Sequence, residues 1–119
     1  MLDRLPSVLL RAEGVAVAAA AVALYFHEGH PWWLLLVLAL APDVSAAGYA
    51  AGPRVGAACY DAAHTYVGPV ALAAVGVLAD AGLAVAVALV WAAHIGVDRA
   101  VGYGLKYPTD FKDTHIQRV

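Results

Sequence analysis

Four long apolar stretches constrain the fold of this chain more than any other feature of its sequence. They occupy residues 7–26, 32–50, 55–79 and 81–105, and each supplies the roughly 20 predominantly apolar residues that a membrane-spanning helix needs. None of them shows the alternation of polar and apolar residues that is typical of membrane barrel strands. With 63% hydrophobic and only 13% charged residues, a chain of this length could not bury its apolar surface as a water-soluble domain. The sequence therefore predicts an all-α, polytopic membrane protein with four transmembrane helices.

The connections between these stretches are short, polar and punctuated by glycine and proline: residues 27–31, 51–54 and 79–82. Loops of this length make consecutive helices antiparallel neighbours. We therefore expect residues 1–119 to form a single membrane domain, an antiparallel four-helix bundle followed by a polar tail at 106–119. Pro42 and Pro69 fall inside the second and third stretches, where membrane helices tolerate kinks if neighbours satisfy the freed backbone groups.

The basic residues predict an orientation. In a four-pass topology all seven lie on one side of the membrane: Arg4, Arg11, Arg54, Arg99, Lys106, Lys112 and Arg118. The positive-inside rule then places both termini, and the tail at 106–119, in the cytoplasm. Trp32 and Trp33 open the second stretch at the opposite face, where an aromatic belt is expected.

Charge and cysteine content exclude several classes of partner. The formal net charge is −2, and the few basic residues are used for orientation, so we expect membrane lipids and no nucleic acid as partners. Cys59 is the single cysteine, which allows no internal disulfide and disfavours a cysteine-based metal site.

Ionisable residues recur inside the apolar stretches at similar depth. Counting along the helices at 1.5 Å per residue places five of them about 9–17 Å from the inner boundary. They are Asp43, Asp61, His64, His94 and Asp98. A charge exposed to hydrocarbon costs about 3 kcal/mol or more, so such groups face the bundle interior and pair there.

The spacing of these residues favours one polar centre. His94 and Asp98 are four residues apart and share a helical face, as do Asp61 and His64 at a spacing of three. Asp43 has no partner within a turn, so its partner must come from another helix. Several tyrosines can donate hydrogen bonds into such a centre or anchor the helices at the interface: Tyr49, Tyr60, Tyr66 and Tyr103.

The chemistry of imidazole and carboxylate leaves three functions open. Asp43, His64, His94 and Asp98 can bind a divalent metal ion such as Zn²⁺, Mn²⁺ or Fe²⁺, or can act as acid–base groups without one. The leading interpretation is an intramembrane enzyme, metal-dependent or not, with these four as catalytic residues acting on a lipid or other apolar small molecule.

Aspartate–histidine chains also serve as proton relays, so a homo-oligomeric proton-linked transporter or channel is the first alternative. The abundant alanine and glycine would allow the close helix contacts of such an assembly. The second alternative is a non-catalytic membrane scaffold, in which the polar groups only fix the register of the helices at about 1 kcal/mol per contact.

Two segments carry a resemblance to known proteins. "APDVSAAGYAAGPRVGAACYDAAHTY" and "WAAHIGVDRAVGYGLKYPTDFKDTH" resemble a bacterial family of small four-helix membrane proteins catalogued as a domain of unknown function. The resemblance covers nearly the whole chain and implies a topology and a bacterial inner (plasma) membrane location, but no activity. The motif positions are Asp43, His64, His94, Asp98, Lys106 and His115.

Two of these motif positions lie at or beyond the end of the fourth stretch. Lys106 can meet an anionic lipid headgroup or serve as an ordinary cytoplasmic anchor. His115 lies in a tail that can fold back over the inner mouth of the bundle or remain solvated.

Overall fold

The computed structural model describes residues 4–102, and this part of the chain contains helices and no strand. The helices are α1 (Leu5–His27), α2 (Trp32–Ala39), the 3₁₀-helix η2 (Ala41–Ala51), α3 (Pro53–His64), α4 (Val67–Leu78) and α5 (Gly82–Val101). The all-α prediction is therefore confirmed. The predicted tail, with Lys106 and His115, lies outside the described residues.

Four segments are long and apolar enough to cross a membrane: Leu5–His27, Trp32–Ala51, Pro53–Leu78 and Gly82–Val101. The prediction of a four-helix membrane bundle is thereby confirmed. Helix α5 ends at Val101, where Gly102 adopts a left-handed conformation with a φ of 105°, and the predicted bound at residue 105 lies outside the described residues. A residue in this conformation terminates a helix.

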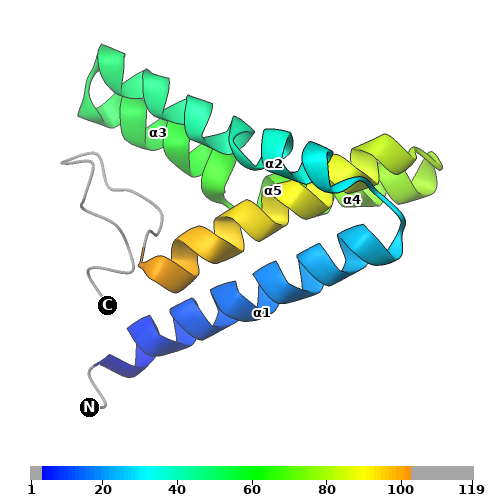
Figure 1. Ribbon diagram of the computed structural model, residues 1–119. Coiled ribbons are helices and arrows are strands. Elements are labelled where there is room, and N and C mark those ends of the chain that lie inside the picture. Colours follow the sequence, from blue (N-terminus) through cyan, green and yellow to red (C-terminus); the bar gives the residue numbers. More distant parts are fainter. Residues whose placement is uncertain (1–3, 103–119) are drawn as a thin grey trace.

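Consecutive spans run antiparallel, and α5 lies at the centre of the bundle (Figure 1). Helices α1 and α4 both pack along α5, α2 also contacts it, and η2 packs on α3. The start of α1, the η2–α3 turn and the end of α5 lie towards the left of the view, and the other two connections lie towards the right. We call the left-hand side the arginine end, because these elements carry Arg4, Arg11, Arg54 and Arg99.

Two glycines allow α1 and α5 to approach closely. A Cβ atom added to Gly96 would lie 2.5 Å from the carbonyl oxygen of Gly14, and one added to Gly14 would lie 2.5 Å from the carbonyl oxygen of Gly96. Any side chain here would therefore push the two backbones apart. Small residues at a helix crossing are the usual basis of packing in membranes, where dispersion contacts replace the hydrophobic effect.

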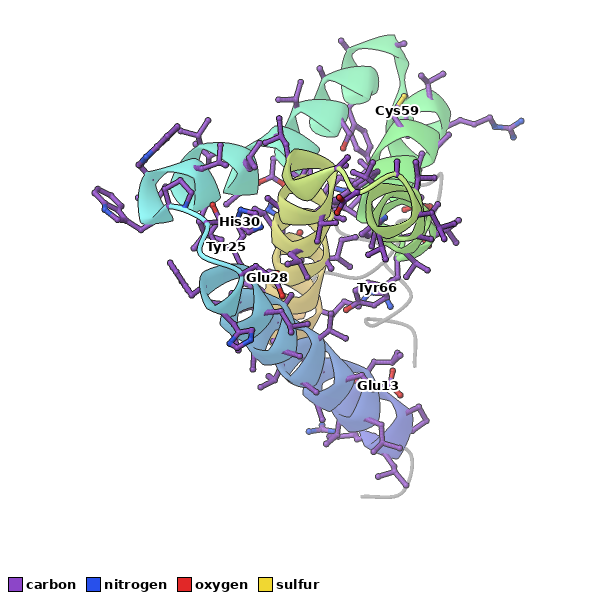
Figure 2. All side chains as sticks on the ribbon, turned by 90° about the vertical axis from the view of Figure 1, so that its right-hand side faces the viewer. Glu13, Tyr25, Glu28, His30, Cys59 and Tyr66 are labelled. Carbon is purple, nitrogen blue, oxygen red and sulfur yellow. The ribbon has the colours of Figure 1, made fainter. Side chains whose placement is uncertain are left out.

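The opposite end of the bundle is closed by an aromatic cluster at the α1–α2 connection. The Tyr25 side chain is fully buried, and its hydroxyl donates a hydrogen bond of 2.6 Å to the carbonyl oxygen of Pro31. The His30 ring lies 5.0 Å from the Tyr25 ring (Figure 2). Tyr25, Ala86 and Val90 form a buried hydrophobic cluster that holds α1 and α5 together near this end of the bundle.

The second and third spans are broken, each close to a proline. The second changes from α-helix to 3₁₀-helix after Ala39, with Pro42 in the first turn of η2. The third is interrupted at Thr65, whose extended backbone (φ −95°, ψ 149°) separates α3 from α4. A proline ring clashes with the carbonyl group four residues earlier, and four residues before Pro69 is Thr65. The predicted kinks are thus interruptions, and they leave backbone carbonyl groups inside the bundle without helical partners.

Candidate metal centre

Four polar side chains from three parts of the chain meet inside the bundle, and we call them the quartet. They are Asp43 in the first turn of η2, His64 at the end of α3, and His94 and Asp98 one turn apart on α5. One nitrogen or oxygen atom from each lies within 4.8 Å of those from the other three. The side chains of His64, His94 and Asp98 are 3%, 10% and 20% exposed, whereas Asp43 is 57% exposed. Three of the four side chains are therefore largely buried, and Asp43 is the one through which solvent or a ligand can reach the quartet.

Five of the six distances between the quartet atoms lie between 3.1 and 3.4 Å. Nε2 of His94 lies 3.1 Å from Oδ1 of Asp43 and 3.3 Å from Oδ2 of Asp98. Nε2 of His64 lies 3.3 Å and 3.4 Å from the same two oxygens, and 3.2 Å from Nε2 of His94. Four ligands bound tetrahedrally at about 2.0–2.1 Å from an ion lie about 3.3 Å from one another. The distances from each histidine to the other three atoms are therefore close to those of a tetrahedral metal site, and all four atoms lie within 4.8 Å of one another.

Both imidazole rings are oriented by backbone carbonyl groups. The Nδ1–H of His64 donates a hydrogen bond of 2.8 Å to the carbonyl oxygen of Tyr60, and the Nδ1–H of His94 donates to that of Ala39. A neutral imidazole with its proton on Nδ1 carries a lone pair on Nε2. Both Nε2 lone pairs therefore point towards the centre of the quartet, which is the arrangement usual for histidines that bind metal.

The charges of the quartet favour a cation between its side chains. Two lone pairs and two carboxylates face one another, and without a positive charge between them they would repel. Protonating both Nε2 atoms would bring two N–H groups together across the 3.2 Å between His64 and His94. A single proton would leave a net charge of −1, whereas a divalent ion would neutralise both carboxylates. A neutral centre is the least costly one in a low-dielectric membrane interior.

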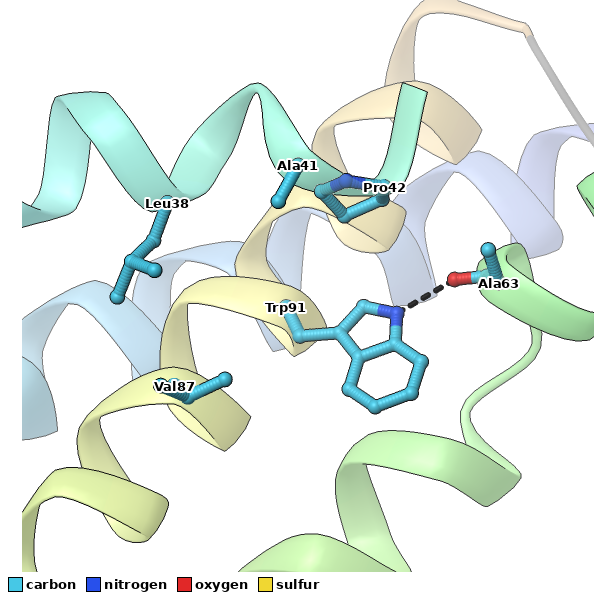
Figure 3. Close-up of a pocket in the computed structure, with 6 residues that line it drawn as sticks. All are labelled: Leu38, Ala41, Pro42, Ala63, Val87 and Trp91. Carbon is cyan, nitrogen blue, oxygen red and sulfur yellow. Dashed lines mark hydrogen bonds between the residues drawn. The ribbon is translucent and has the colours of Figure 1, made fainter. Parts of the chain in front are cut away.

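Two aromatic residues support the quartet. The Tyr60 ring stacks on the His64 ring with centroids 3.7 Å apart, and its hydroxyl donates a 3.3 Å hydrogen bond to Oδ2 of Asp98. The Trp91 indole N–H donates to the carbonyl oxygen of Ala63 in the last turn of α3 (Figure 3). These contacts hold the end of α3 against α5.

The broken spans supply acceptors for these supporting hydrogen bonds. Ala39 is the last residue of α2, and Ala63 lies beside the break at Thr65. Their carbonyl groups bind the His94 and Trp91 side chains instead of continuing a helix. The interruptions that would be costly in lipid therefore orient the side chains of His94 and Trp91.

Two pockets flank the segment that carries Asp43. The Trp91 pocket, of about 260 Å³, lies between Leu38, Pro42, Ala63 and Trp91 and contains no quartet side chain (Figure 3). The quartet pocket, of about 350 Å³, is lined by Asp43, His94 and Asp98 together with eight apolar residues of α1, α2, α5 and the residue that follows α2. Small-molecule sites typically have volumes of about 300–1,000 Å³. The quartet pocket therefore has the size and position of a binding site for an apolar ligand.

The other candidate residues lie elsewhere. Asp61 is on α3, partly buried and outside the quartet. Among the tyrosines, Tyr60 reaches the centre, whereas Tyr66 lies beneath the guanidinium of Arg99, 4.5 Å from it. Lys106, His115 and Tyr103 are outside the described residues.

Sequence reasoning missed the supporting role of Trp91 and of the Ala39 carbonyl group. The only signal in the sequence was the proximity of Trp91 to His94 and of Pro42 to the end of the preceding helix.

Comparison with known proteins gives a family without an activity. The family model described as a domain of unknown function (DUF4260) matches residues 7–119, so the chain belongs to this family. The resemblance noted in the sequence is thereby confirmed. No curated protein and no solved structure matches the chain.

Proposed function

From this family membership, which brings no activity, and from the geometry of the quartet, we propose that the protein is a divalent-metal enzyme of the bacterial inner membrane acting on a lipid or other apolar substrate. Its termini lie in the cytoplasm. The observation that carries the proposal is the convergence of two Nδ1-tethered histidines and two carboxylates within 4.8 Å of one another. Zn²⁺ is the ion that best suits four nitrogen and oxygen ligands in this arrangement.

The quartet residues have different roles in this proposal. His64, His94 and Asp98 are largely buried and hold the ion, as two histidines and one carboxylate do in many catalytic zinc sites. Asp43 is exposed and would be the fourth ligand, where its carboxylate could accept a proton from a water molecule or the substrate. The bound ion would polarise a carbonyl or phosphoryl oxygen, or activate a water molecule.

Metal analysis of the purified protein tests the proposal. We expect about one divalent ion per chain in the wild type, and its loss in His64→Ala and in the nearly isosteric Asp98→Asn. The matched controls are His27→Ala, at the exposed end of α1, and Asp80→Asn, at the α4–α5 connection. A wild-type protein that binds no Zn²⁺, Mn²⁺ or Fe²⁺, even after incubation with each, would overturn the metal centre.

The broken spans favour a transporter as the second candidate. Discontinuous helices with free carbonyl groups near the bilayer midplane are typical of ion sites in transporters. Against this, the walls of the quartet pocket other than the quartet itself are apolar, which suits a hydrocarbon better than a hydrated ion. Proteoliposomes distinguish the two candidates. Metal accumulation without change in the lipids supports a homo-oligomeric transporter, whereas lipid turnover detected by mass spectrometry and abolished by Asp43→Asn supports the enzyme.

A further inference from the structure

We propose that the quartet pocket binds the hydrocarbon chain of an anionic acyl lipid, with a carbonyl or carboxylate oxygen of that lipid at the metal ion. This inference rests on the proposed function, since the ion would hold the polar end of the lipid. It adds a substrate class and a direction of binding, neither of which follows from a metal site alone.

The walls of the pocket are suited to a hydrocarbon chain. Val22 of α1, Leu35 of α2 and Val90 of α5 line it from three helices. The pocket can be entered from the lipid, because Leu36 and Val97 on its rim are 58% and 52% exposed and Asp43 is also exposed. In a membrane span, the molecule in contact with such an opening is a lipid.

The pocket has a polar end and an apolar end. Asp98 lines it near the arginine end, and Val90 lines it eight residues away along α5, which is about 12 Å at the rise of an α-helix. The apolar end therefore lies farther from the arginine end than the quartet does. A lipid whose headgroup lies at the membrane surface near the arginine end has its hydrocarbon chain pointing away from that end. It can therefore enter the pocket without turning over in the membrane.

A positive charge lies beyond the polar end. The Arg11 guanidinium lies against Gly102, 2.8 Å from the position that a Cβ atom would take there. Gly102 is one helical turn beyond Asp98. The order along the bundle is thus a cation, then the quartet, then apolar walls. This order matches an anionic headgroup, an acyl carbonyl group and a hydrocarbon chain.

Cobalt-loaded protein allows this inference to be tested without knowledge of the reaction. Co²⁺ replaces the divalent ion and gives visible absorption bands that change when a ligand binds to it. The probes are acetohydroxamic acid, which has only the metal-binding head, and decanohydroxamic acid, which adds a hydrocarbon chain. Val97→Trp and Leu36→Trp introduce bulk from two walls of the pocket at exposed positions that the fold can tolerate.

We expect both Trp variants to weaken the binding of decanohydroxamic acid by about tenfold or more and to leave the binding of acetohydroxamic acid nearly unchanged, because the added bulk meets the hydrocarbon chain and not the metal-binding head. The matched control is Val101→Trp, one turn further along α5, 60% exposed and not part of the pocket lining; it should leave both affinities unchanged. Unaltered cobalt bands in the unliganded variants would show that the metal site is intact.

The failures of the two proposals are distinguishable. If the wild type binds no Co²⁺, the metal centre itself fails. If Co²⁺ binds but the Trp variants do not weaken decanohydroxamic acid, or if neither probe changes the bands, the lipid chain does not use this pocket. A selective effect of Val87→Trp, in the Trp91 pocket, would place the chain on the other side of Asp43 and would also overturn the inference.

Discussion

At the scale of single residues, the position of the ring proton in His64 and His94 determines what the quartet can bind. Because carbonyl groups of Tyr60 and Ala39 accept these protons, the two Nε2 atoms are left to face the carboxylates. Residues that orient the ligands then matter almost as much as the ligands themselves. Tyr60 does so twice, through its ring on His64 and its hydroxyl on Asp98.

Tyr60→Phe separates these two contributions of Tyr60. The variant keeps the stacked ring but loses the hydrogen bond to Asp98, so we expect metal affinity to fall by about tenfold while the stoichiometry is unchanged. Competition with a chromophoric chelator measures the affinity. Tyr66→Phe is the control, because Tyr66 contacts Arg99 rather than the quartet. Equal affinities in the wild type and Tyr60→Phe would mean that the hydroxyl does not orient Asp98.

The common depth of the quartet residues could be predicted from the sequence. The depth of Asp43, His64, His94 and Asp98 within their apolar stretches indicated a common layer, and the structure brings these side chains together. Their unequal exposure could not be foreseen, because it depends on how η2 lies relative to α5. The carbonyl groups that accept hydrogen bonds from the two histidines could not be foreseen either, because such a group becomes available only where a helix ends or is interrupted.

At the scale of elements, the hairpin formed by η2 and α3 is joined to the rest of the bundle largely through side chains. The two helices pack on each other, whereas α1 and α4 pack on α5. The links from α3 to α5 include the quartet, the Tyr60–Asp98 hydrogen bond and the Trp91–Ala63 hydrogen bond. A bound ion would therefore also hold this hairpin in place.

The α1–α5 crossing is expected to be the least tolerant contact between helices. Gly96→Ala should destabilise the protein by about 1–3 kcal/mol, because the new methyl group would meet the Gly14 carbonyl oxygen at 2.5 Å. Gly82→Ala on the same helix meets nothing within 4 Å and should be neutral or stabilising by up to about 1 kcal/mol. Thermal unfolding in detergent compares the two. Similar midpoints for both variants would contradict the close approach of the helices.

The number and order of the spans could be predicted because each stretch is long enough to cross the membrane and each connection is short. The breaks could be predicted only in part. Pro69 indicated a distortion in the third span, but the site of the interruption is Thr65, where the proline ring would meet a carbonyl group of a continuous helix. The left-handed conformation of Gly102 could not be predicted, because a glycine in an apolar helix can equally be a packing residue.

At the scale of the whole molecule, charge is distributed unevenly between the two ends of the bundle. Arg4, Arg11, Arg54 and Arg99 lie at or near the arginine end. The connections at the opposite end, residues 28–31 and 79–81, contain Glu28 and Asp80 and no lysine or arginine. Asp98 and His94 of the quartet lie about one and two turns from the end of α5, so the quartet is closer to the arginine end. The orientation of the bundle therefore decides which leaflet of the membrane would supply the lipid.

Cysteine labelling in intact bacterial cells tests this orientation. Cys59 is the only cysteine, so a Cys59→Ser background leaves a single introduced thiol to react. Ala79→Cys and Ala51→Cys are both exposed and lie at opposite ends of the bundle. If the arginine end faces the cytoplasm, as the positive-inside rule predicts, a membrane-impermeant maleimide labels Ala79→Cys in intact cells and labels Ala51→Cys only after permeabilisation. The reverse pattern would place the arginine end outside, and the quartet would then draw its lipid from the outer leaflet.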